Sequence, residues 1–389
     1  MTRLTQRKSL LGTIILSGMI FLQTLAIGQE LPRSAVPDLQ ISRTDRLNVF
    51  NKAWEAVNKH FFDPKFNGVA WVQMKVKYQP LVESATDKAQ LRAVLNGMAG
   101  ELHVSHIGVT GFSRGVNYNY GLDLTPIEGK WLVRATGQDS IAQRSGVERG
   151  WILTAAEGDC VGPERKVSVR MLDLQEQTRS LELPCGSHPF PPESSIVQPL
   201  EGGAVYLRFI SFQPAPAKWL ADQVARNMSA PAIVLDLRYN PGGEGDVVKK
   251  VGNLFFSERT NFGIFHNRKG KKAGILKAGS SSAYRGRLIV LIDHRSHSGA
   301  EVFARTVQET GRGIVVGETS GGEVLSSTNY KLPSGFAIHL PTLDYHTAKG
   351  MRLEGRGVQP DVAVSMTAKD FRENKDPVLD RVRQLLQER

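Results

Sequence analysis

The chain is poor in cysteine and its histidines are not clustered, which argues against a structural zinc site. Its 389 residues include only two cysteines, Cys160 and Cys185, and nine histidines spread along the sequence. A structural zinc ion needs several such ligands at close spacing. In an oxidising compartment the two cysteines would instead be candidates for a disulfide, although the sequence alone does not show that they pair.

Acidic residues are outnumbered, yet no nucleic-acid-binding module is recognisable. Lys and Arg total 49 against 38 Asp and Glu, which gives a net charge of +11. Because this positive charge is spread along the chain, we expect no nucleic-acid partner and leave association with an anionic membrane surface open. The content of 41% hydrophobic and 22% charged residues excludes a disordered, collagen-like or coiled-coil protein.

The chain has a single long uncharged apolar run, and it lies at the N-terminus. Three basic residues within the first eight positions precede the run from Ser9 to Gly28. A basic start, an apolar middle and small residues at the end are typical of a secretory signal peptide. We therefore assign residues 1–28 to a signal peptide and expect a periplasmic or extracellular protein. An uncleaved membrane anchor remains an alternative, because the run is about as long as a short membrane span.

Hydrophobic periodicity predicts helices in an N-terminal region over residues 29–114. Apolar residues between Leu47 and Phe61 recur at three- and four-residue steps, as on one face of a helix. A second helix is expected to start at Asp87, a capping residue with Gln90 three positions further on. It ends just before the pair Ser105-His106.

The remaining sequence predicts a multidomain α/β protein. Short strand-forming runs between Gly, Pro and Asp turns indicate a small β-rich domain over 115–190. Strand and helix patterns then alternate in a core domain over 191–376, which favours a mainly parallel sheet. Within that core, the basic segment 266–287 is interpreted as a solvated loop. Residues 377–389 carry the pattern of an amphipathic C-terminal helix.

A strand, a turn containing a serine and a helix follow one another around Ser298. The buried-strand run Leu288–Ile292 leads into this turn, and the helix begins at Gly299. This order is that of a nucleophile elbow, although the usual Gly-x-Ser-x-Gly motif is absent. The Gly299 amide would lie at a helix N-terminus, where backbone donors favour an oxyanion. A serine that merely caps the helix explains the pattern equally well.

Two further motifs supply the other groups that a serine hydrolase needs. Asn240-Pro241-Gly242-Gly243 follows the strand Ala232–Leu237, and its paired glycines let the backbone approach a ligand closely. An N–H of Gly242 or Gly243 is thus a candidate second oxyanion donor, with a plain turn as the alternative. His106 offers an imidazole, the usual general base near neutral pH. A capping serine beside an unrelated histidine is the alternative there.

Taken together and in this order, the motifs resemble the tail-specific (C-terminal processing) peptidase family. The resemblance covers most of the chain and includes Ser105-His106, Asp236–Gly243, Ser296–Glu301 and Glu354–Asp361. It implies an α/β protease core of the ClpP/crotonase-like type.

The resemblance also implies an inserted PDZ domain at residues 115–190. Tyr120, Gly121 and Leu122 would then lie in its carboxylate-binding loop. Such a domain binds extended peptide by adding it as a strand to a sheet edge, including a free C-terminus.

One departure from the family pattern indicates which branch of the family the chain resembles. Glu323 stands where the Ser–Lys members of the family have their catalytic lysine. The chain instead resembles the tricorn-core branch. That branch implies Ser298 as nucleophile and His106 as base, with Ser105 and Glu354 orienting the imidazole.

The implied activity is that of an exported serine endopeptidase acting on extended or unfolded polypeptides, with no metal or other cofactor. Two alternatives remain open. One is a noncatalytic protein on the same scaffold that binds peptide or a hydrophobic ligand, since a fold does not fix a function. The other is a Ser–Lys peptidase whose lysine comes from elsewhere, such as Lys331 or Lys349.

Overall fold

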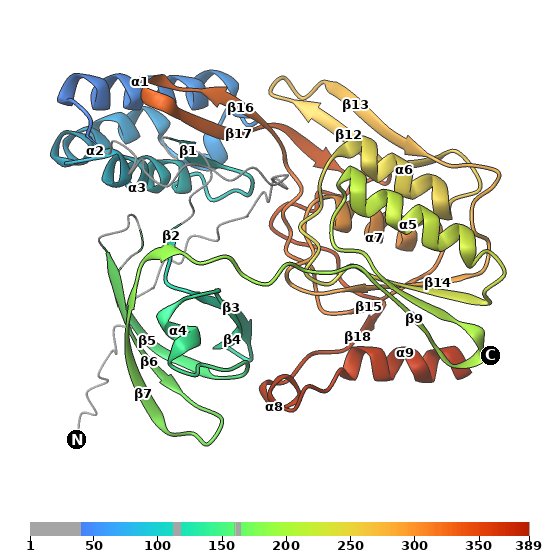
Figure 1. Ribbon diagram of the computed structural model, residues 1–389. Helices are drawn as coiled ribbons and strands as arrows, with labels where there is room; N and C mark the ends of the chain where they lie inside the picture. The colour runs from blue at the N-terminus through green and yellow to red at the C-terminus, as the bar shows by residue number, and fades with distance from the viewer. Residues whose placement is uncertain (1–39, 112–117, 159, 161–164, 389) are drawn as a thin grey trace, which may run out of the picture. The chain divides into compact units, whose positions relative to one another are not determined.

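The computed structural model describes residues 40–111, 118–158, 160 and 165–388 (Figure 1). The predicted signal peptide over residues 1–28 lies outside these residues. In the part of the chain that is described, no helix combines the length and the apolar character needed to cross a membrane.

A six-stranded sheet lies at the centre of the α/β core. Its strand order is β18-β15-β14-β11-β10-β9, and every neighbouring pair is parallel except β9 with β10. The prediction of a mainly parallel sheet is therefore confirmed. The strands are β9 (Ile196–Pro199), β10 (Val205–Arg208), β11 (Ala232–Asp236), β14 (Arg287–Ile292), β15 (Ile314–Gly317) and β18 (Val362–Ala363).

Helices cover both faces of this sheet, which explains the continuous apolar runs of its strands. Ile233 and Leu235 of β11 belong to one buried cluster, which includes residues of three helices, whereas Val234 belongs to a second cluster beside the C-terminal helix. The helices are α5 (Pro214–Arg226), α6 (Gly245–Phe255), α7 (Gly299–Thr310) and α9 (Pro377–Gln387). Because α7 follows β14 directly, its first residues lie at the carboxyl edge of the parallel strands, where α/β enzymes place their sites.

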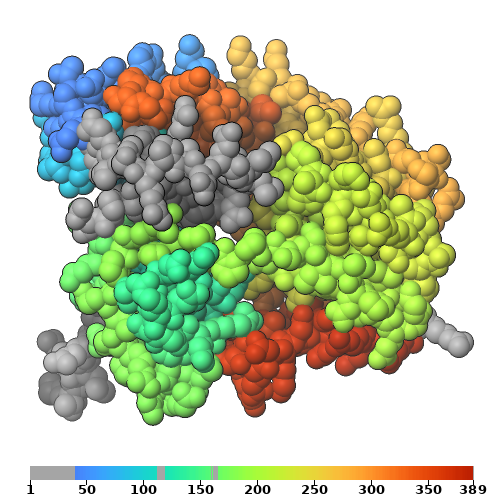
Figure 2. All heavy atoms as spheres, viewed as in Figure 1, coloured from blue at the N-terminus to red at the C-terminus, as the bar shows by residue number. Residues whose placement is uncertain are grey.

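A second sheet of five strands contradicts one sequence-based prediction. Residues 266–287 were expected to form a solvated loop, but they contribute to the antiparallel pair β12 and β13. Leu276 points into the core while Ile275 and Lys277 are exposed, so the strand alternation is present but masked by basic residues on the outer face. The gold surface in Figure 2 includes this hairpin. The strands are β1 (Gly108–Gly111), β12 (Thr260–Asn267), β13 (Lys272–Ala278), β16 (Ser326–Lys331) and β17 (Phe336–His346).

The N-terminal helices share their hydrophobic core with strands from much later in the chain. These helices are α1 (Arg43–His60), α2 (Trp71–Ser84) and α3 (Lys88–Gly100). The predicted start at Asp87 is confirmed, because its carboxylate accepts a hydrogen bond from the Gln90 N–H at 2.8 Å. Phe336 and Ile338 of β17 are buried in the same cluster as the helices. This packing holds the segment after α3 beside the C-terminal third of the chain.

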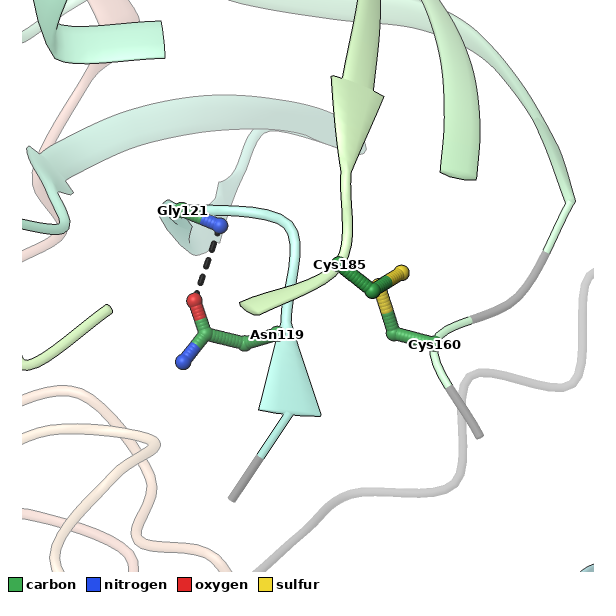
Figure 3. The surroundings of a disulfide bond; sticks show 4 residues. All are labelled: Asn119, Gly121, Cys160 and Cys185. Carbon is green, nitrogen blue, oxygen red and sulfur yellow. Dashed lines mark hydrogen bonds between the residues drawn. A yellow bond between two sulfur atoms is a disulfide. The ribbon is translucent and has the colours of Figure 1, made fainter. Parts of the chain in front are cut away.

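A third sheet of five antiparallel strands occupies the predicted β-rich region. Its strands are β3 (Leu122–Ile127), β4 (Lys130–Thr136), β5 (Ile152–Gly158), β6 (Lys166–Leu172) and β7 (Thr178–Pro184). The short helix α4 (Ile141–Arg144) and the small pair β2 (Tyr118–Asn119) and β8 (Gly186–Ser187) accompany it. Cys160 and Cys185 form a disulfide, with their Cα atoms 5.4 Å apart (Figure 3). Helix α8 (Ala368–Arg372) precedes α9.

Candidate active site

Ser298 lies between β14 and α7 in a backbone conformation that is rare for residues other than glycine. Its φ is 53° and its ψ is −115°. Residues are held in such regions mainly where the surrounding structure enforces them, as at a nucleophile elbow. No hydrogen bond to its hydroxyl caps the helix among the described residues, although Ser298 and Glu301 have the arrangement of a capping box. The unusual backbone conformation therefore favours a nucleophile elbow over a serine that only caps the helix.

The carboxylate of Glu301 fixes the backbone around Ser298. It accepts hydrogen bonds from the Ser298 N–H at 3.0 Å and the Ser320 hydroxyl at 2.6 Å. The N–H groups of Gly322 and Glu323 donate to it as well, at 2.7 and 2.8 Å. These four bonds hold the loop 320–323 against the nucleophile. No role for Glu301 was predicted from the sequence, although its place in the first turn of a helix after a serine is a recognisable capping signal.

The three predicted oxyanion donors are not equivalent in the structure. The Gly242 N–H already donates to Asn240 Oδ1 at 2.8 Å, which removes it from the candidates. The N–H groups of Gly243 and Gly299 donate to no other described residue. They are also close together, because a Cβ built on Gly299 would lie 3.5 Å from the Gly243 nitrogen. We therefore retain Gly243 and Gly299 as the donor pair.

Gly242 is nonetheless required for packing against the nucleophile, and replacing it by alanine is expected to impair the site. A Cβ there would lie 2.6 Å from the Gly299 nitrogen and 2.7 Å from Ser298 Cβ. We expect Gly242→Ala to lower kcat at least ~100-fold, because displacements of about 1 Å in an active site have effects of that size. The free energy of unfolding should fall by about 1–3 kcal/mol from overpacking, in addition to the backbone strain.

Gly350→Ala is the matched control for this prediction. Both glycines have a φ of +83°, but a Cβ at Gly350 has no neighbour within 4 Å. The control should show only the backbone strain of about 1–2 kcal/mol and keep its activity. Steady-state peptide hydrolysis and urea unfolding measure both quantities, and equal activities of the two variants would contradict the packing argument.

A hydrogen-bonded chain joins Glu354, Ser105 and His106. Glu354 accepts from the Ser105 N–H at 2.7 Å and from the Ser105 hydroxyl at 2.9 Å. The Ser105 oxygen lies 2.8 Å from His106 Nδ1. Glu354 is only 7% exposed and also accepts from the Val324 N–H at 3.0 Å. The structure thus brings together three of the four predicted catalytic residues, from segments 249 positions apart.

The direction of these bonds assigns the tautomer of His106. A carboxylate only accepts, so the Ser105 hydroxyl must give its proton to Glu354. The Ser105 oxygen then accepts from His106 Nδ1–H, which leaves the lone pair on Nε2. His106 therefore presents the nitrogen that a general base needs.

Ser298 and His106 belong to segments that are distant in the sequence but near each other in the structure. His297, the residue before Ser298, interacts electrostatically with His106. In the described structure no hydrogen bond joins the Ser298 hydroxyl to the imidazole. Catalytic hydrogen bonds are often long in unliganded enzymes and tighten when substrate is bound.

Burial lowers the pKa of His106 to about 4, with further contributions from His339 and His297. Because only the neutral imidazole accepts a proton, the acid limb of kcat/KM should have its midpoint near pH 4 rather than near the usual histidine value. Activity should consequently persist at pH 5. A pH series with a peptide that has no ionisable side chain measures this, with circular dichroism at each pH as the control for unfolding. A midpoint near 6.5 would contradict it.

The other predicted binding and catalytic residues take no part in this hydrogen-bonded chain. The Gly121 N–H, expected to bind a substrate carboxylate, donates to Asn119 Oδ1 at 2.8 Å (Figure 3). Tyr120 and Leu122 flank it at the start of β3. Lys331 and Lys349 are exposed, at the end of β16 and in the turn after β17. Within the described residues, no three His, Cys, Asp or Glu side chains are arranged to hold a metal ion.

Comparison with known proteins places these features in a family context. The model of peptidase family S41 matches residues 203–364, and that of the tricorn protease C1 domain matches residues 42–100. The chain is similar to a carboxyl-terminal-processing protease of Synechocystis sp., with 26% identity over 86% of this chain and 84% of the relative.

Two further comparisons agree with that match. A putative tricorn protease homolog 2 of Streptomyces coelicolor is 25% identical over 85% of this chain, which spans 31% of that longer relative. The solved structure of a photosystem II D1 C-terminal processing protease shares the fold, with a TM-score of 0.57 and 21% identity. It covers 88% of this chain and 97% of that one.

Proposed function

We propose that this chain, which matches the model of peptidase family S41 over residues 203–364, is an exported serine endopeptidase that cleaves extended or unfolded polypeptides. The proposed catalytic residues are Ser298, His106, Ser105 and Glu354. The observation that carries the proposal is the hydrogen-bonded chain from Glu354 through Ser105 to His106. Such a chain fixes the tautomer and orientation of an imidazole, as a general base requires.

In the proposed first step, His106 Nε2 accepts the proton of the Ser298 hydroxyl while Oγ bonds to the carbonyl carbon of the scissile peptide. The carbonyl oxygen becomes an oxyanion that accepts hydrogen bonds from the N–H groups of Gly243 and Gly299. Loss of one such donor typically raises the barrier by about 3–4 kcal/mol. The imidazolium formed in this step is stabilised because Ser105 links it to the Glu354 carboxylate.

In the second step, His106 gives its proton to the leaving nitrogen, the C–N bond breaks, and the amine product departs. A water molecule then attacks the ester on Ser298 with His106 again accepting a proton. The carboxylic acid product leaves and the Ser298 hydroxyl is restored. We propose no metal or other cofactor. In each of these reaction steps a group of the chain accepts the proton or stabilises the charge that develops.

We further propose that residues 115–190 are a PDZ-like domain that presents the polypeptide substrate, including a free C-terminus. The five-stranded sheet there has β3 and β7 at its edges. An extended peptide binds such an edge through main-chain hydrogen bonds. Recognition of a terminal carboxylate by Gly121 would require the N–H to leave Asn119.

Export is part of the same proposal. The predicted signal peptide directs the chain to a periplasmic or extracellular location, with an N-terminal membrane anchor as the alternative. The disulfide between Cys160 and Cys185 supports this, because disulfides persist mainly in oxidising compartments.

The decisive experiment is incubation of the protein without residues 1–28 with an unfolded, reduced and alkylated polypeptide. Mass spectrometry of the products should show internal cleavage, and a sample pretreated with a serine-directed phosphonate should release no fragments. Binding of the polypeptide without fragments in either sample would contradict the proposal and favour a noncatalytic binding protein.

A further inference from the structure

Two polar atoms beside the nucleophile are enclosed but have no hydrogen-bond partner. They are His297 Nδ1 and Glu323 Oε2, which lie 3.5 Å apart. Both residues adjoin Ser298, since His297 precedes it and the Glu323 carbonyl accepts its N–H at 2.8 Å. Enclosed polar atoms almost always have partners in folded proteins, so an unpartnered pair at this position calls for an explanation. The mechanism proposed above uses neither side chain.

The carboxylate of Glu323 lacks a positive partner in the described part of the chain. The single basic group within 4 Å of it is His297, and burial lowers the pKa of this imidazole to about 4, so it is neutral at pH 7. Burial together with the negative charges of Glu301 and Glu354 raises the pKa of Glu323 to about 7. At pH 7 the Glu323 carboxyl is therefore about half ionised, and a cation arriving here would favour its ionised form by supplying a counter-charge that the described chain does not provide.

Glu323 remains reachable by a ligand. Its side chain is 31% exposed and that of His297 is 19% exposed. Its second oxygen, Oε1, is neither enclosed nor bonded to a described residue. A ligand can therefore approach the Glu323 side chain at Oε1, whereas His297 lies beside the enclosed oxygen Oε2.

We propose that Glu323, with His297 beside it, determines specificity by receiving a cationic side chain of the substrate residue on one side of the scissile bond. This inference rests on the peptidase function proposed above. The ammonium of lysine or the guanidinium of arginine brings the donors and the charge that the carboxylate lacks. A neutral aliphatic side chain of the same length brings neither, and it would cover Oε1 without supplying a partner for either oxygen. A site built for a polar partner discriminates strongly against an analogue without it.

The test compares peptides that differ only in lysine or norleucine, placed at the residue before or after the scissile bond. For the wild type we expect kcat/KM to favour lysine at one of these positions by about 10- to 100-fold, the usual value of a hydrogen bond to a charged group. Glu323→Gln should reduce this preference to below about 3-fold while leaving the norleucine peptide nearly unaffected. Glu258→Gln, which removes an exposed carboxylate elsewhere, should keep the preference.

Three results would overturn this assignment: no lysine preference in the wild type, an unchanged preference in Glu323→Gln, or equal losses for both peptides. Dissociation constants measured with the Ser298→Ala chain, with and without Glu323→Gln, keep this test separate from the proposed function. If the wild type cleaves neither peptide, the peptidase proposal fails, and the norleucine-to-lysine ratio of those dissociation constants decides the role of Glu323. A ratio of 10 or more that is lost in the double variant supports the assignment, and a ratio near 1 rejects it.

Discussion

Replacement of Ser298 by alanine is expected to lower kcat for peptide hydrolysis by roughly 10⁴- to 10⁶-fold, the range seen when a triad nucleophile is removed. The hydroxyl is the atom that forms the acyl-enzyme, and no water molecule can take its place with the same geometry. The residual rate should come from the oxyanion donors and substrate binding alone. Binding of an unfolded polypeptide should be retained, because the side chain contributes little to it.

Ser334→Ala is a suitable control for the loss of a serine hydroxyl at positive φ. Ser334 has a φ of 57°, close to the 53° of Ser298, but it lies exposed in the 3-10 turn before β17. The Ser334→Ala chain should hydrolyse peptides at the wild-type rate. A Ser298→Ala chain with more than about a tenth of wild-type kcat, and with its thermal unfolding unchanged, would exclude Ser298 as the nucleophile.

His106→Ala is expected to have an effect of similar size, roughly 10⁴- to 10⁶-fold on kcat. Without the imidazole, nothing in the relay accepts the Ser298 proton, and Ser105 and Glu354 have no ring to orient. The double variant Ser298→Ala/His106→Ala should be no worse than either single variant, because residues that act as a unit give non-additive losses. Peptide turnover, measured with the enzyme in excess over substrate, would detect rates this low.

The same measurement separates the Ser–His mechanism from a Ser–Lys mechanism. Lys331 and Lys349 are exposed, and Lys331→Ala and Lys349→Ala should both remain active. His103→Ala is the matched control for the histidine, since His103 is exposed three positions away and has a φ of 50° against 56° for His106. Full activity in His106→Ala together with loss in one lysine variant would reverse the assignment of the base.

The elements that local sequence determines were predicted well. The helix Gly299–Thr310 begins at the expected residue and Pro377–Gln387 lies within the expected segment 377–389, because apolar periodicity and a boundary residue act within one or two turns. The mainly parallel sheet followed from buried apolar runs, which the strands require because both faces are covered. The hairpin of β12 and β13 was missed because basic residues on its outer face mask the strand alternation.

The site was harder to predict, because its geometry depends on contacts between distant segments. No local pattern relates Glu354 to Ser105, 249 positions earlier, so their pairing was expected only from the family resemblance. Gly242 and Gly243 are equivalent as sequence, and only the position of the Asn240 side chain distinguishes their N–H groups. Three of the four bonds accepted by Glu301 likewise depend on a loop about twenty residues later in the chain.

The central claim is that His106 activates Ser298, and covalent labelling with a serine-directed phosphonate tests it most directly. Peptide mapping after labelling should place the adduct on Ser298 in the wild type. The second-order labelling rate should fall by at least ~10³-fold in His106→Ala and stay unchanged in His103→Ala, since the nucleophile is weak without its base. An adduct on another residue, or equal labelling rates with and without His106, would contradict the account.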